Sequence, residues 1–583
     1  MFTTRPELLG TFGMVASTHW LASAAGMSVL ERGGNAADAA VAAAFVLQVV
    51  EPHLNGLGGE ANILAGGPAH GVEMYCGQGV TPRAATIDAY TSLGLDLVPG
   101  TGPLAATVPG AFGAWMLLLL RRGTWRVRDV LEYAIGYAER GCPLVPRIVD
   151  AIAQLEQLFR DEWTTSADIY LARGVPRAGE LFANVPLAET YRRIVAEAEA
   201  ASADRDAQIE AALNAFYRGF VAERIHAFVS SHDVLDTSGE RHRGLLTADD
   251  LASWSPTVEQ PLTVDYEGIT IHKAGPWSQG PVMLQQLQLL KEVRVASTGH
   301  LSADWIHLVT ESAKLCFADR EAWYGDPDHT DVPLPELLSD EYATGRARLV
   351  GDRASFELRP GSPAGRAPRL PRLPGAVPAA ELRPDGLTRG DTCHVDVVDR
   401  DGMMVSGTPS GGWFQSSPVV PGLGLSLNTR AQMLWLEPGL PASMAPGVRP
   451  RTTLTPSMAS IDGVPFFAFG TPGGDQQDQW SLNFLLAYLH ASRNIQQAID
   501  APMFHTTHFP SSFYPRGCEP GHLVVEDRLD SRVISELAAR GHAVDIVPGW
   551  SQGRLSGVLR DPVTGVLKAG ANPRGMQGYA VGR

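Results

Sequence analysis

Seven prolines fall between Leu358 and Pro384, and this run limits the possible folds of the chain more than any other feature. Proline lacks a backbone N–H group and fixes φ, so a segment with a proline every few residues cannot lie inside a helix or a sheet. We therefore expect an extended, exposed linker over residues 358–388. The linker separates a long N-terminal part from a shorter C-terminal part of the 583-residue chain.

A β-hairpin is predicted directly after the linker. Residues 395–399 alternate apolar and polar side chains, which is typical of a strand. Asp401-Gly402 is a strong hairpin-turn signal, and residues 403–410 are expected to return as the second strand. With a two-residue turn, the expected pairs are Val398 with Val405, Val395 with Thr408, and Cys393 with Ser410.

Thr392 begins this hairpin, and we expect the hydroxyl groups of Thr408 and Ser410 close to it. The Thr392 hydroxyl can attack the carbonyl group of Asp391, and an N-to-O acyl shift followed by hydrolysis then cuts the chain. The new α-amino group, with an ordinary pKa of about 7.7–8.0, can serve as the base for the adjacent hydroxyl. A threonine that begins a strand can also be a plain β-former, and Cys393 is an alternative nucleophile.

A glycine-rich turn follows a second predicted strand, residues 465–469. The turn contains Gly473 and Gly474 and precedes a helical pattern that begins near Gln479. Consecutive backbone N–H groups before a helix can bind an oxyanion. The same glycines would also suit a simple strand-to-helix turn.

Capping and periodicity predict helices in the N-terminal part. Residues 21–31 read as a helix that ends at Gly33-Gly34. Asn35 can cap a second helix over residues 36–50, which is apolar on nearly all sides and should be buried. The clearest later helical pattern covers residues 190–213.

Four blocks, in order over nearly the whole chain, make the sequence similar to the γ-glutamyltransferase (γ-glutamyltranspeptidase) family of N-terminal-nucleophile hydrolases. The blocks are Gly33 to Ala39 with Gly58-Gly59, Ala318-Asp319-Arg320 with Gly325-Asp326-Pro327, Thr392-Cys393-His394 with its hairpin, and Pro472-Gly473-Gly474.

This resemblance implies an α+β fold, a four-layer αββα sandwich that forms a single large domain. The precursor would be cut between Asp391 and Thr392 into a large subunit, residues 1–391, and a small catalytic subunit, residues 392–583. The two subunits would stay intertwined and could assemble further into a dimer of heterodimers.

The resemblance also implies roles for individual residues. Thr392 is the nucleophile, Thr408 and Ser410 support its new amine, and the glycine turn at 473–474 forms the oxyanion hole. Thr452 and Thr453 match a serine pair that helps to hold the glutamyl group. No metal and no organic cofactor is expected.

The sequence departs from the family where true γ-glutamyl enzymes bind their substrate. Gln78 stands where an arginine binds the α-carboxylate, Gly412 replaces an asparagine, and Gln432-Met433 replaces the acidic pair that binds the glutamyl amine. Glutathione is therefore not the expected substrate. Asn428 and Arg430 resemble a divergent branch and are candidate substrate-binding residues; Arg430 could instead form a structural ion pair.

These features predict an autoprocessing amide or acyl hydrolase, or an acyltransferase, that takes a small-molecule acyl donor and uses water or an amine as acceptor. The divergent branch includes amidohydrolases, acylases and homologues in antibiotic pathways that hydrolyse a carbon–carbon bond next to an oxalyl-type group. A carbon–carbon hydrolase that releases oxalate is therefore one alternative. A non-catalytic binding scaffold of the same fold is another, because the charged substrate clamps are lost.

Composition narrows the classes of partner. The 47 Lys and Arg residues against 63 Asp and Glu give a net charge of −16, which opposes binding to nucleic acid and to anionic membranes. The five cysteines are widely spaced and form no C-x-x-C pair, so neither a disulfide framework nor a zinc ribbon is expected. The sequence shows no secretory signal and no apolar run long enough to span a bilayer, and we expect a cytoplasmic protein.

Overall fold

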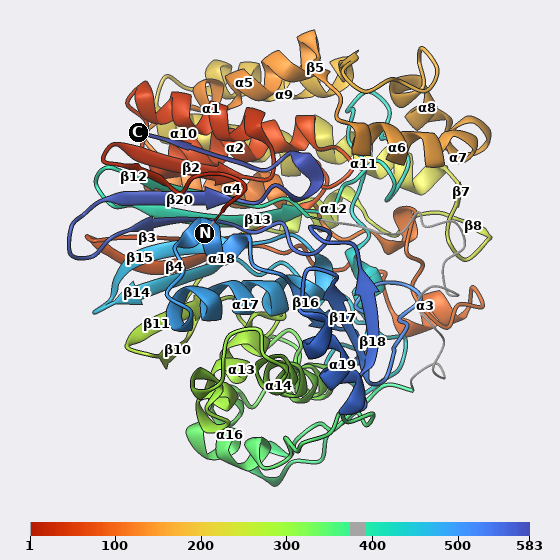
Figure 1. Ribbon diagram of the computed structural model, residues 1–583. Coiled ribbons are helices and arrows are strands. Elements are labelled where there is room, and N and C mark those ends of the chain that lie inside the picture. Colours follow the sequence, from red (N-terminus) through yellow and green to blue (C-terminus); the bar gives the residue numbers. More distant parts are fainter. Residues whose placement is uncertain (1, 373–391) are drawn as a thin grey trace.

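The computed structural model describes residues 2–372 and 392–583, and two seven-stranded sheets lie face to face at its centre (Figure 1). Neighbouring strands are antiparallel throughout both sheets. Sheet I has the order β21 (Tyr579–Gly582), β2 (Gly13–Ser17), β12 (Val395–Asp399), β13 (Met404–Ser410), β3 (Glu60–Gly67), β4 (His70–Gly77), β9 (Thr257–Glu259). Sheet II has the order β1 (Leu8–Gly10), β20 (Leu567–Ala571), β19 (Ser556–Arg560), β15 (Val464–Gly470), β14 (Ser457–Ile461), β11 (Ile269–Lys273), β10 (Leu262–Tyr266).

Apolar side chains fill much of the space between the two sheets. Met14, Met74 and Met404 of sheet I pack with Met458 and Val558 of sheet II, and all five are fully buried. In each strand the intervening residues point outward to the helical layers, as the twofold period of a strand requires.

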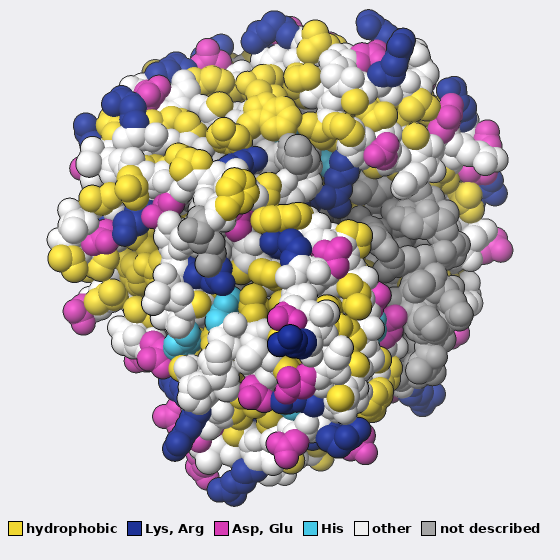
Figure 2. All heavy atoms as spheres, in the orientation of Figure 1, with side chains coloured by type: hydrophobic (Ala, Val, Ile, Leu, Met, Phe, Trp, Pro, Cys, Tyr) yellow, Lys and Arg dark blue, Asp and Glu magenta, His cyan; other side chains and the backbone are white. Residues whose placement is uncertain are grey.

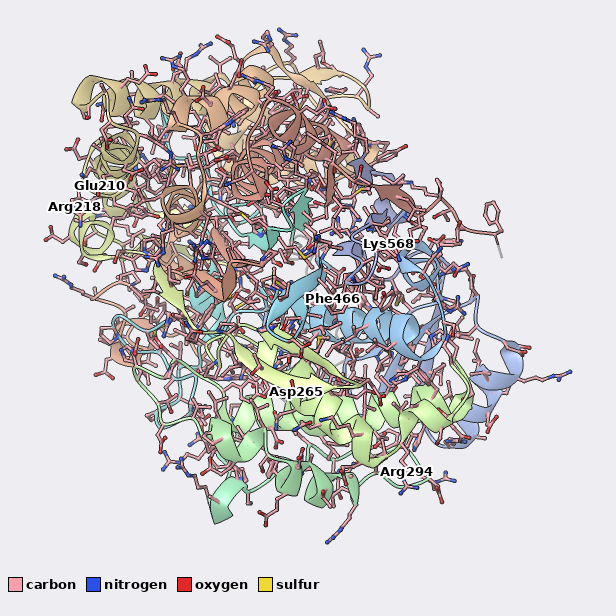
Figure 3. All side chains as sticks on the ribbon, turned by 90° about the vertical axis from the view of Figure 1, so that its left-hand side faces the viewer. Glu210, Arg218, Asp265, Arg294, Phe466 and Lys568 are labelled. Carbon is pink, nitrogen blue, oxygen red and sulfur yellow. The ribbon has the colours of Figure 1, made fainter. Side chains whose placement is uncertain are left out.

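Helices cover the outer face of each sheet (Figures 1 and 3). In Figure 3, Glu210 and Arg218 of the helices above sheet I lie far from Arg294 below sheet II, and Phe466 of β15 lies between them. The apolar cluster on the outer side of sheet I includes α1 (Trp20–Glu31), α2 (Ala36–Val50), α4 (Ala111–Arg122), α5 (Val127–Arg140), α9 (Val185–Ala201), α10 (Arg205–Tyr217) and α11 (Phe220–Ser231). The cluster on the outer side of sheet II includes α13 (Gly280–Glu292), α14 (Ala303–Trp323), α17 (Gln477–His490), α18 (Ile495–Ile499) and α19 (Ser531–Ala539). The fold is the expected four-layer αββα sandwich.

Capping side chains explain where two of these helices, α2 and α10, begin. Asn35 caps α2 through a capping box with Asp38, and all residues of α2 are buried. The helical pattern at residues 190–213 is two helices rather than one. Ser202 is extended, with φ −163°, and the side chain of Asp204 accepts a hydrogen bond from the N–H of Ala207 at 2.9 Å, which begins α10.

The described part of the proline-rich segment, residues 358–372, contains one short 3-10 turn (Pro363–Gly365) and no strand. It is less exposed than expected, because Gly361 is buried against α14. The N–H of Gly361 donates to Oδ1 of Asp319 at 2.6 Å, and its carbonyl oxygen accepts from Nε1 of Trp323 at 3.1 Å. The rest of the expected linker, and Asp391, lie outside the described residues.

Other expectations concern the surface and the thiols. Within residues 2–372 and 392–583, we find no helix that combines the length and the apolar character needed to cross a membrane. All five cysteines are buried as thiols without a disulfide partner. Figure 2 shows acidic and basic side chains interspersed over one face of the molecule.

Candidate active site

The predicted hairpin is present as β12 and β13, but its register differs from the prediction by one residue. Val398 lies opposite Met404, and Val395 lies opposite Gly407. The predicted two-residue turn was wrong because the loop holds three residues, the last of which is Gly402 with φ +87°. A left-handed glycine after two turn residues closes a three-residue hairpin loop in this way.

The observed register places Thr392 directly opposite Ser410. Oγ1 of Thr392 donates a hydrogen bond to Oγ of Ser410 at 3.2 Å and accepts one from Nε2 of Gln477 at 3.4 Å. The pair does not share backbone hydrogen bonds, because the N–H of Cys393 donates to the carbonyl oxygen of Pro409 at 3.0 Å. Side chains at such a position of an antiparallel ladder are the closest together.

Two further polar cross-strand pairs follow on the same face of the hairpin. Nδ1 of His394 lies 3.0 Å from Oγ1 of Thr408, and Nε2 of His394 lies 2.9 Å from Oδ1 of Asp396. Oγ of Ser406 donates to the same carboxylate oxygen at 2.7 Å. An imidazole that donates from Nε2 to a carboxylate leaves Nδ1 to accept the Thr408 proton. Of the two predicted supporting hydroxyl groups, Ser410 therefore contacts the nucleophile candidate and Thr408 contacts His394.

Cys393 points to the opposite face of β12. Its Sγ donates to Oε2 of Glu51 at 3.0 Å, and Oγ1 of Thr18 donates to the same oxygen at 2.5 Å. Burial, with the carboxylate of Glu51 beside it, raises the pKa of the Cys393 thiol well above its ordinary value. A thiol in such surroundings is a poor nucleophile, so the structure does not favour the Cys393 alternative.

The turn between β15 and α17 has a backbone that favours glycine. Gly473 has φ +137° and Gly474 has φ +57°. A Cβ atom at position 473 would lie 2.2 Å from the side chain of Trp480, and one at position 474 would lie 2.9 Å from Phe513. Because Gln477, the first residue of α17, contacts Thr392, the turn and the nucleophile candidate belong to one site.

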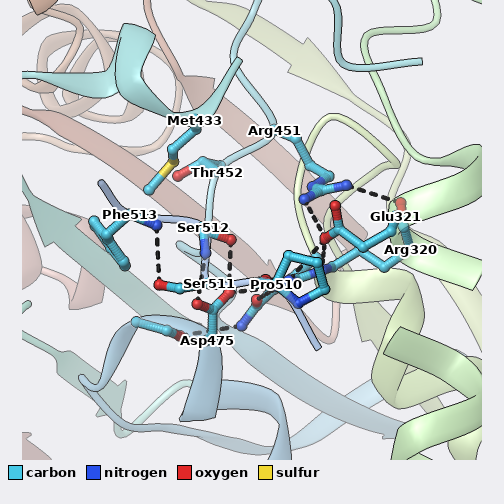
Figure 4. Close-up of polar contacts among 12 residues, drawn as sticks. Arg320, Glu321, Met433, Arg451, Thr452, Asp475, Pro510, Ser511, Ser512 and Phe513 are labelled. Carbon is cyan, nitrogen blue, oxygen red and sulfur yellow. Dashed lines mark hydrogen bonds and ion pairs between the residues drawn. The ribbon is translucent and has the colours of Figure 1, made fainter. Parts of the chain in front are cut away.

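Asp475 anchors this turn through buried polar contacts (Figure 4). Its Oδ1 accepts from Nη1 of Arg320 at 2.5 Å and from Oγ of Ser512 at 2.6 Å, and its Oδ2 accepts from the N–H of Ser512 at 2.8 Å. Burial opposes the charge on Asp475, but Arg320 and these hydrogen bonds from Ser512 lower its pKa overall. The family block that contains Arg320 thus holds the glycine turn in place through Asp475.

Two more buried arginines extend this cluster. Nη2 of Arg451 donates to Oε1 of Glu321 at 2.6 Å, and Nη2 of Arg516 donates to the carbonyl oxygen of Met433 at 3.0 Å. Burial lowers the pKa of Arg516 to about 9. The charged side chains seen together in Figure 4 hold the turn, the segment after Arg451 and the loop after Pro510 against one another.

Thr452 and Thr453 follow Arg451 directly. The N–H of Thr452 donates to the carbonyl oxygen of Trp277, and its own carbonyl oxygen accepts from the N–H of Gln279, both at 2.9 Å. Oγ1 of Thr452 accepts from the N–H of Leu454 at 3.2 Å. Oγ1 of Thr453 is buried and has no hydrogen-bond partner within the described part of the chain, so it could bind a ligand.

Glu60 was not singled out by the sequence, and it lies directly opposite Ser410 in the pairing of β3 with β13. Its Oε2 accepts from Nε of Arg430 at 2.9 Å, and both side chains are buried. Burial raises the pKa of Glu60 to about 7, although Arg430 acts in the opposite direction. Oε1 of Glu60 and Nη2 of Arg430 have no hydrogen-bond partner among the described residues. Arg430 therefore forms the ion pair that was the alternative to substrate binding, and its Nη2 has no hydrogen-bond partner within the described chain.

The side chain of Asn428 is already engaged. Its Nδ2 donates to the carbonyl oxygens of Gly58 at 3.1 Å and of Thr107 at 3.0 Å, and its Oδ1 accepts from the N–H of Thr107 at 3.0 Å. These bonds hold the glycine-rich loop before β3 against the segment that carries Arg430. A direct contact of Asn428 with substrate stays a prediction.

One described group of side chains has ligand atoms close enough to share a metal ion: His307, Glu311 and His542. Nδ1 of His307 is hydrogen-bonded to Nε2 of His542 at 2.9 Å, and Nζ of Lys314 lies 2.6 Å from Oε1 of Glu311. The ammonium group already neutralises the carboxylate, so we interpret the group as a structural contact between α14 and the segment after α19.

A model of the gamma-glutamyltranspeptidase family matches residues 22–582. The chain belongs to this family. A curated relative, the glutathione hydrolase-like YwrD proenzyme of Bacillus subtilis (strain 168), is 32% identical over 99% of both chains. The oxamate amidohydrolase proenzyme of Klebsiella pneumoniae is 29% identical over 97% of this chain and 98% of the relative.

Two solved structures of the same type span the chain. A threonine-to-alanine variant of LmbA2991 is 59% identical, with a TM-score of 0.96 over 100% of both chains. The cephalosporin acylase from Bacillus halodurans is 29% identical, with a TM-score of 0.84 over 100% of this chain and 97% of that one. The protein is thus an N-terminal-nucleophile hydrolase of the γ-glutamyltranspeptidase type.

Two positions at which the sequence comparison predicts the loss of a substrate-binding charge carry glutamine, Gln78 and Gln432. Gln78 lines a cavity of about 280 Å³, and its Oε1 has no hydrogen-bond partner in the described chain. Arg449 lines the same cavity, but Asp326 and Glu259 pair with it at 2.7 and 2.6 Å. The amide of Gln432 is bonded to the N–H of Tyr514 at 2.9 Å. Neither position offers a spare charge for a glutamyl group.

Proposed function

We propose that Thr392 is the nucleophile of an autoprocessing amide (acyl) hydrolase. The observation that carries this proposal is the buried Thr392 hydroxyl, which is bonded to Ser410 and Gln477 at the start of the hairpin that follows the proline-rich segment. The contacts of Ser410 and Gln477 orient Oγ1 before any substrate binds.

Processing and catalysis would use the same atoms. In processing, Oγ1 of Thr392 attacks the carbonyl carbon of Asp391, the C–N bond breaks as the ester forms, and water hydrolyses the ester. In turnover, the new α-amino group takes the hydroxyl proton while Oγ1 attacks the substrate carbonyl. The N–H groups of Gly473 and Gly474 stabilise the oxyanion, and the proton leaves with the departing amine. Water then releases the acyl group, or an amine accepts it.

The cut would yield a large subunit, residues 1–391, and a small subunit, residues 392–583. Strand order supports a stable pair, because β12 and β13 of the small subunit lie between β2 and β3 of the large one. Each junction is an antiparallel ladder of backbone hydrogen bonds. A further dimer of such heterodimers belongs to the same proposal.

For the acyl donor, we propose a small amide with a carboxylate near the reacting carbonyl rather than a γ-glutamyl group. Gln78 and Gln432 supply no charge at the glutamyl positions, whereas Nη2 of Arg430, next to the Ser410 row, has no hydrogen-bond partner among the described residues. The oxamate named for the Klebsiella relative is an amide of this kind. Thr452 and Thr453 would bind the polar part of the acyl group.

A carbon–carbon hydrolase that releases oxalate from an oxalyl-type substrate is the second candidate. The oxamate relative favours it indirectly, because the same oxalyl group could be attached through carbon instead of nitrogen. Product analysis distinguishes the two: oxalate with ammonia or an amine indicates amide hydrolysis, and oxalate with a carbon fragment indicates the alternative. If neither set of products forms, the non-catalytic scaffold is favoured.

Intact-protein mass spectrometry tests the nucleophile. Cleavage before Thr392 divides the 62.4 kDa chain into pieces of about 42 and 21 kDa by residue proportion. We expect both masses in the wild type and in Thr392→Ser, and one uncut mass in Thr392→Ala. A wild-type chain that stays uncut, or a Thr392→Ala chain that is cut at this position, contradicts the proposal.

A further inference from the structure

The buried pair Glu60–Arg430 lies in the row of side chains that contains the nucleophile candidate. Thr392 lies opposite Ser410, and Ser410 lies opposite Glu60, so the three side chains share the inner face of sheet I. Gly411 follows Ser410, and a Cβ atom there would lie 2.4 Å from Oε2 of Glu60. Only glycine at this position lets the carboxyl group lie over the end of β13.

Two polar atoms of this pair are left without partners. Nε of Arg430 uses one carboxylate oxygen of Glu60 at 2.9 Å, while Oε1 of Glu60 and Nη2 of Arg430 are buried and unpartnered within the described chain. Leaving both an acceptor and a donor unsatisfied in one buried pair costs stability. The pair therefore fits a ligand better than it fits a purely structural role.

We propose that a substrate carboxylate binds Nη2 of Arg430 and that Glu60 takes up a proton from solvent as it does so. One carboxylate oxygen of the ligand accepts from Nη2, and the other accepts from the new O–H at Oε1 of Glu60. The charges balance, because the ligand replaces the Glu60 carboxylate as the counter-ion of Arg430. The inference rests on the function proposed above and identifies Glu60 as a specificity-determining residue.

The surroundings make this proton uptake possible near neutral pH. Burial raises the pKa of Glu60 to about 7 despite the Arg430 guanidinium. The residues around Glu60 are Ser410 of β13, Gly411 directly after this strand, and Arg430, and Asn428 lies against the same glycine. Of these, only Arg430 is charged. The α-amino group that processing would create at Thr392 lies in the same row and titrates in the same pH range, so the Glu60→Gln variant, which keeps this amine, separates the two groups.

Calorimetric titration of the purified wild-type protein with pyruvate tests the inference. Pyruvate carries a carboxylate beside a carbonyl group but has no amide to hydrolyse, and pyruvamide is its neutral counterpart. With the pKa of Glu60 at about 7, pyruvate should bind about tenfold more weakly at pH 8 than at pH 6. Titrations in HEPES and in Tris at each pH measure proton uptake, which should approach one proton per pyruvate at pH 8 and fall towards none at pH 6.

Variants distinguish protonation of Glu60 from a general effect of pH on pyruvate binding. Glu60→Gln should bind pyruvate equally at pH 6 and pH 8 without proton uptake, and Arg430→Gln should lose binding. Glu526→Gln is the matched control, because Glu526 forms a buried pair with Arg574 at 3.4 Å outside this row. It should keep the wild-type pH dependence. Pyruvamide should show no pH dependence with any of the proteins.

The inference is overturned if the wild type binds pyruvate with the same affinity at pH 6 and pH 8, if it binds without proton uptake at pH 8, or if it does not bind pyruvate at all. It is also overturned if Glu60→Gln keeps the pH dependence. Mass spectrometry on the same samples tells this failure from a failure of the proposed function. A protein that is cut before Thr392 but takes up no proton with pyruvate contradicts only the role of Glu60. A protein that stays uncut contradicts the proposal that Thr392 is the nucleophile.

Discussion

Nε2 of Gln477 lies 3.4 Å from Oγ1 of Thr392, although 85 residues separate them in the sequence. Gln477 begins α17 directly after the glycine turn, and Thr392 begins the hairpin of sheet I. This contact therefore spans the two sheets of the sandwich at one end. It sets the distance between the proposed nucleophile and the proposed oxyanion hole.

Ser410→Ala should slow both processing and turnover. The variant removes the hydrogen bond that orients Oγ1 of Thr392, and a bond worth about 1 kcal/mol corresponds to a fall in kcat of about fivefold to tenfold. Time-resolved mass spectrometry measures processing, and steady-state kinetics on oxamate measures turnover. Ser410→Thr keeps the hydroxyl and should recover most of both rates. Unchanged rates in Ser410→Ala would show that this hydroxyl is dispensable.

Gly474→Ala should lower activity out of proportion to its effect on stability. The new methyl group would lie 2.9 Å from Phe513 at φ +57°, so the turn or the Phe513 ring must move. Gly463→Ala is the control, because Gly463 has φ +79° and open space around it. Both should lose about 1–2 kcal/mol of unfolding free energy, but only Gly474→Ala should lose about 100-fold in kcat. Equal activity in the two variants would show that the glycine turn is not part of the active site.

Arg320→Lys should destabilise the fold strongly. Lysine cannot reproduce the bonds of Arg320 to Asp475 and Glu321, and breaking a buried ion pair costs about 3–5 kcal/mol. Urea unfolding followed by circular dichroism measures the loss. Arg366→Lys, in an exposed pair with Asp331, should change stability by less than about 1 kcal/mol. Similar losses of unfolding free energy in both variants would mean that the buried ion pairs of Arg320 stabilise the fold no more than an exposed pair does.

His505→Gln should make stability less sensitive to acid. Burial lowers the pKa of His505 to about 3, whereas the unfolded chain binds this proton near pH 6.5. The unfolded state therefore binds more protons as the pH falls below 6.5, and the wild type loses about 1.4 kcal/mol per pH unit from this group. Between pH 7.5 and pH 5, the stability of the wild type relative to the variant should fall by about 2 kcal/mol. A constant difference in urea midpoints would contradict the shift.

Local sequence signals predicted local structure well. Asn35 predicted the start of α2, because a capping side chain and the N–H groups it binds are neighbours in sequence. The hairpin was predicted for the same reason. Its register was not, because the choice between a two-residue and a three-residue loop depends on the left-handed backbone of Gly402.

The most informative part of the site was beyond sequence reasoning. Glu60 and Arg430 are 370 residues apart, and neither position reveals the other without the pairing of β3 with β13. The family blocks predicted a role for Thr392 and for the glycine turn. They did not identify Gln477 or Glu60, which lie next to those blocks only in the folded chain.

Sheet I has a consequence for how the protein can be made. Once the chain is cut before Thr392, β12 and β13 belong to one polypeptide and the strands on either side, β2 and β3, belong to another. Refolding the denatured mature enzyme then requires two molecules to meet and thread their strands between one another, which depends on concentration and competes with aggregation. The uncut precursor is the form able to fold by itself, so thermal inactivation of the mature enzyme should be irreversible.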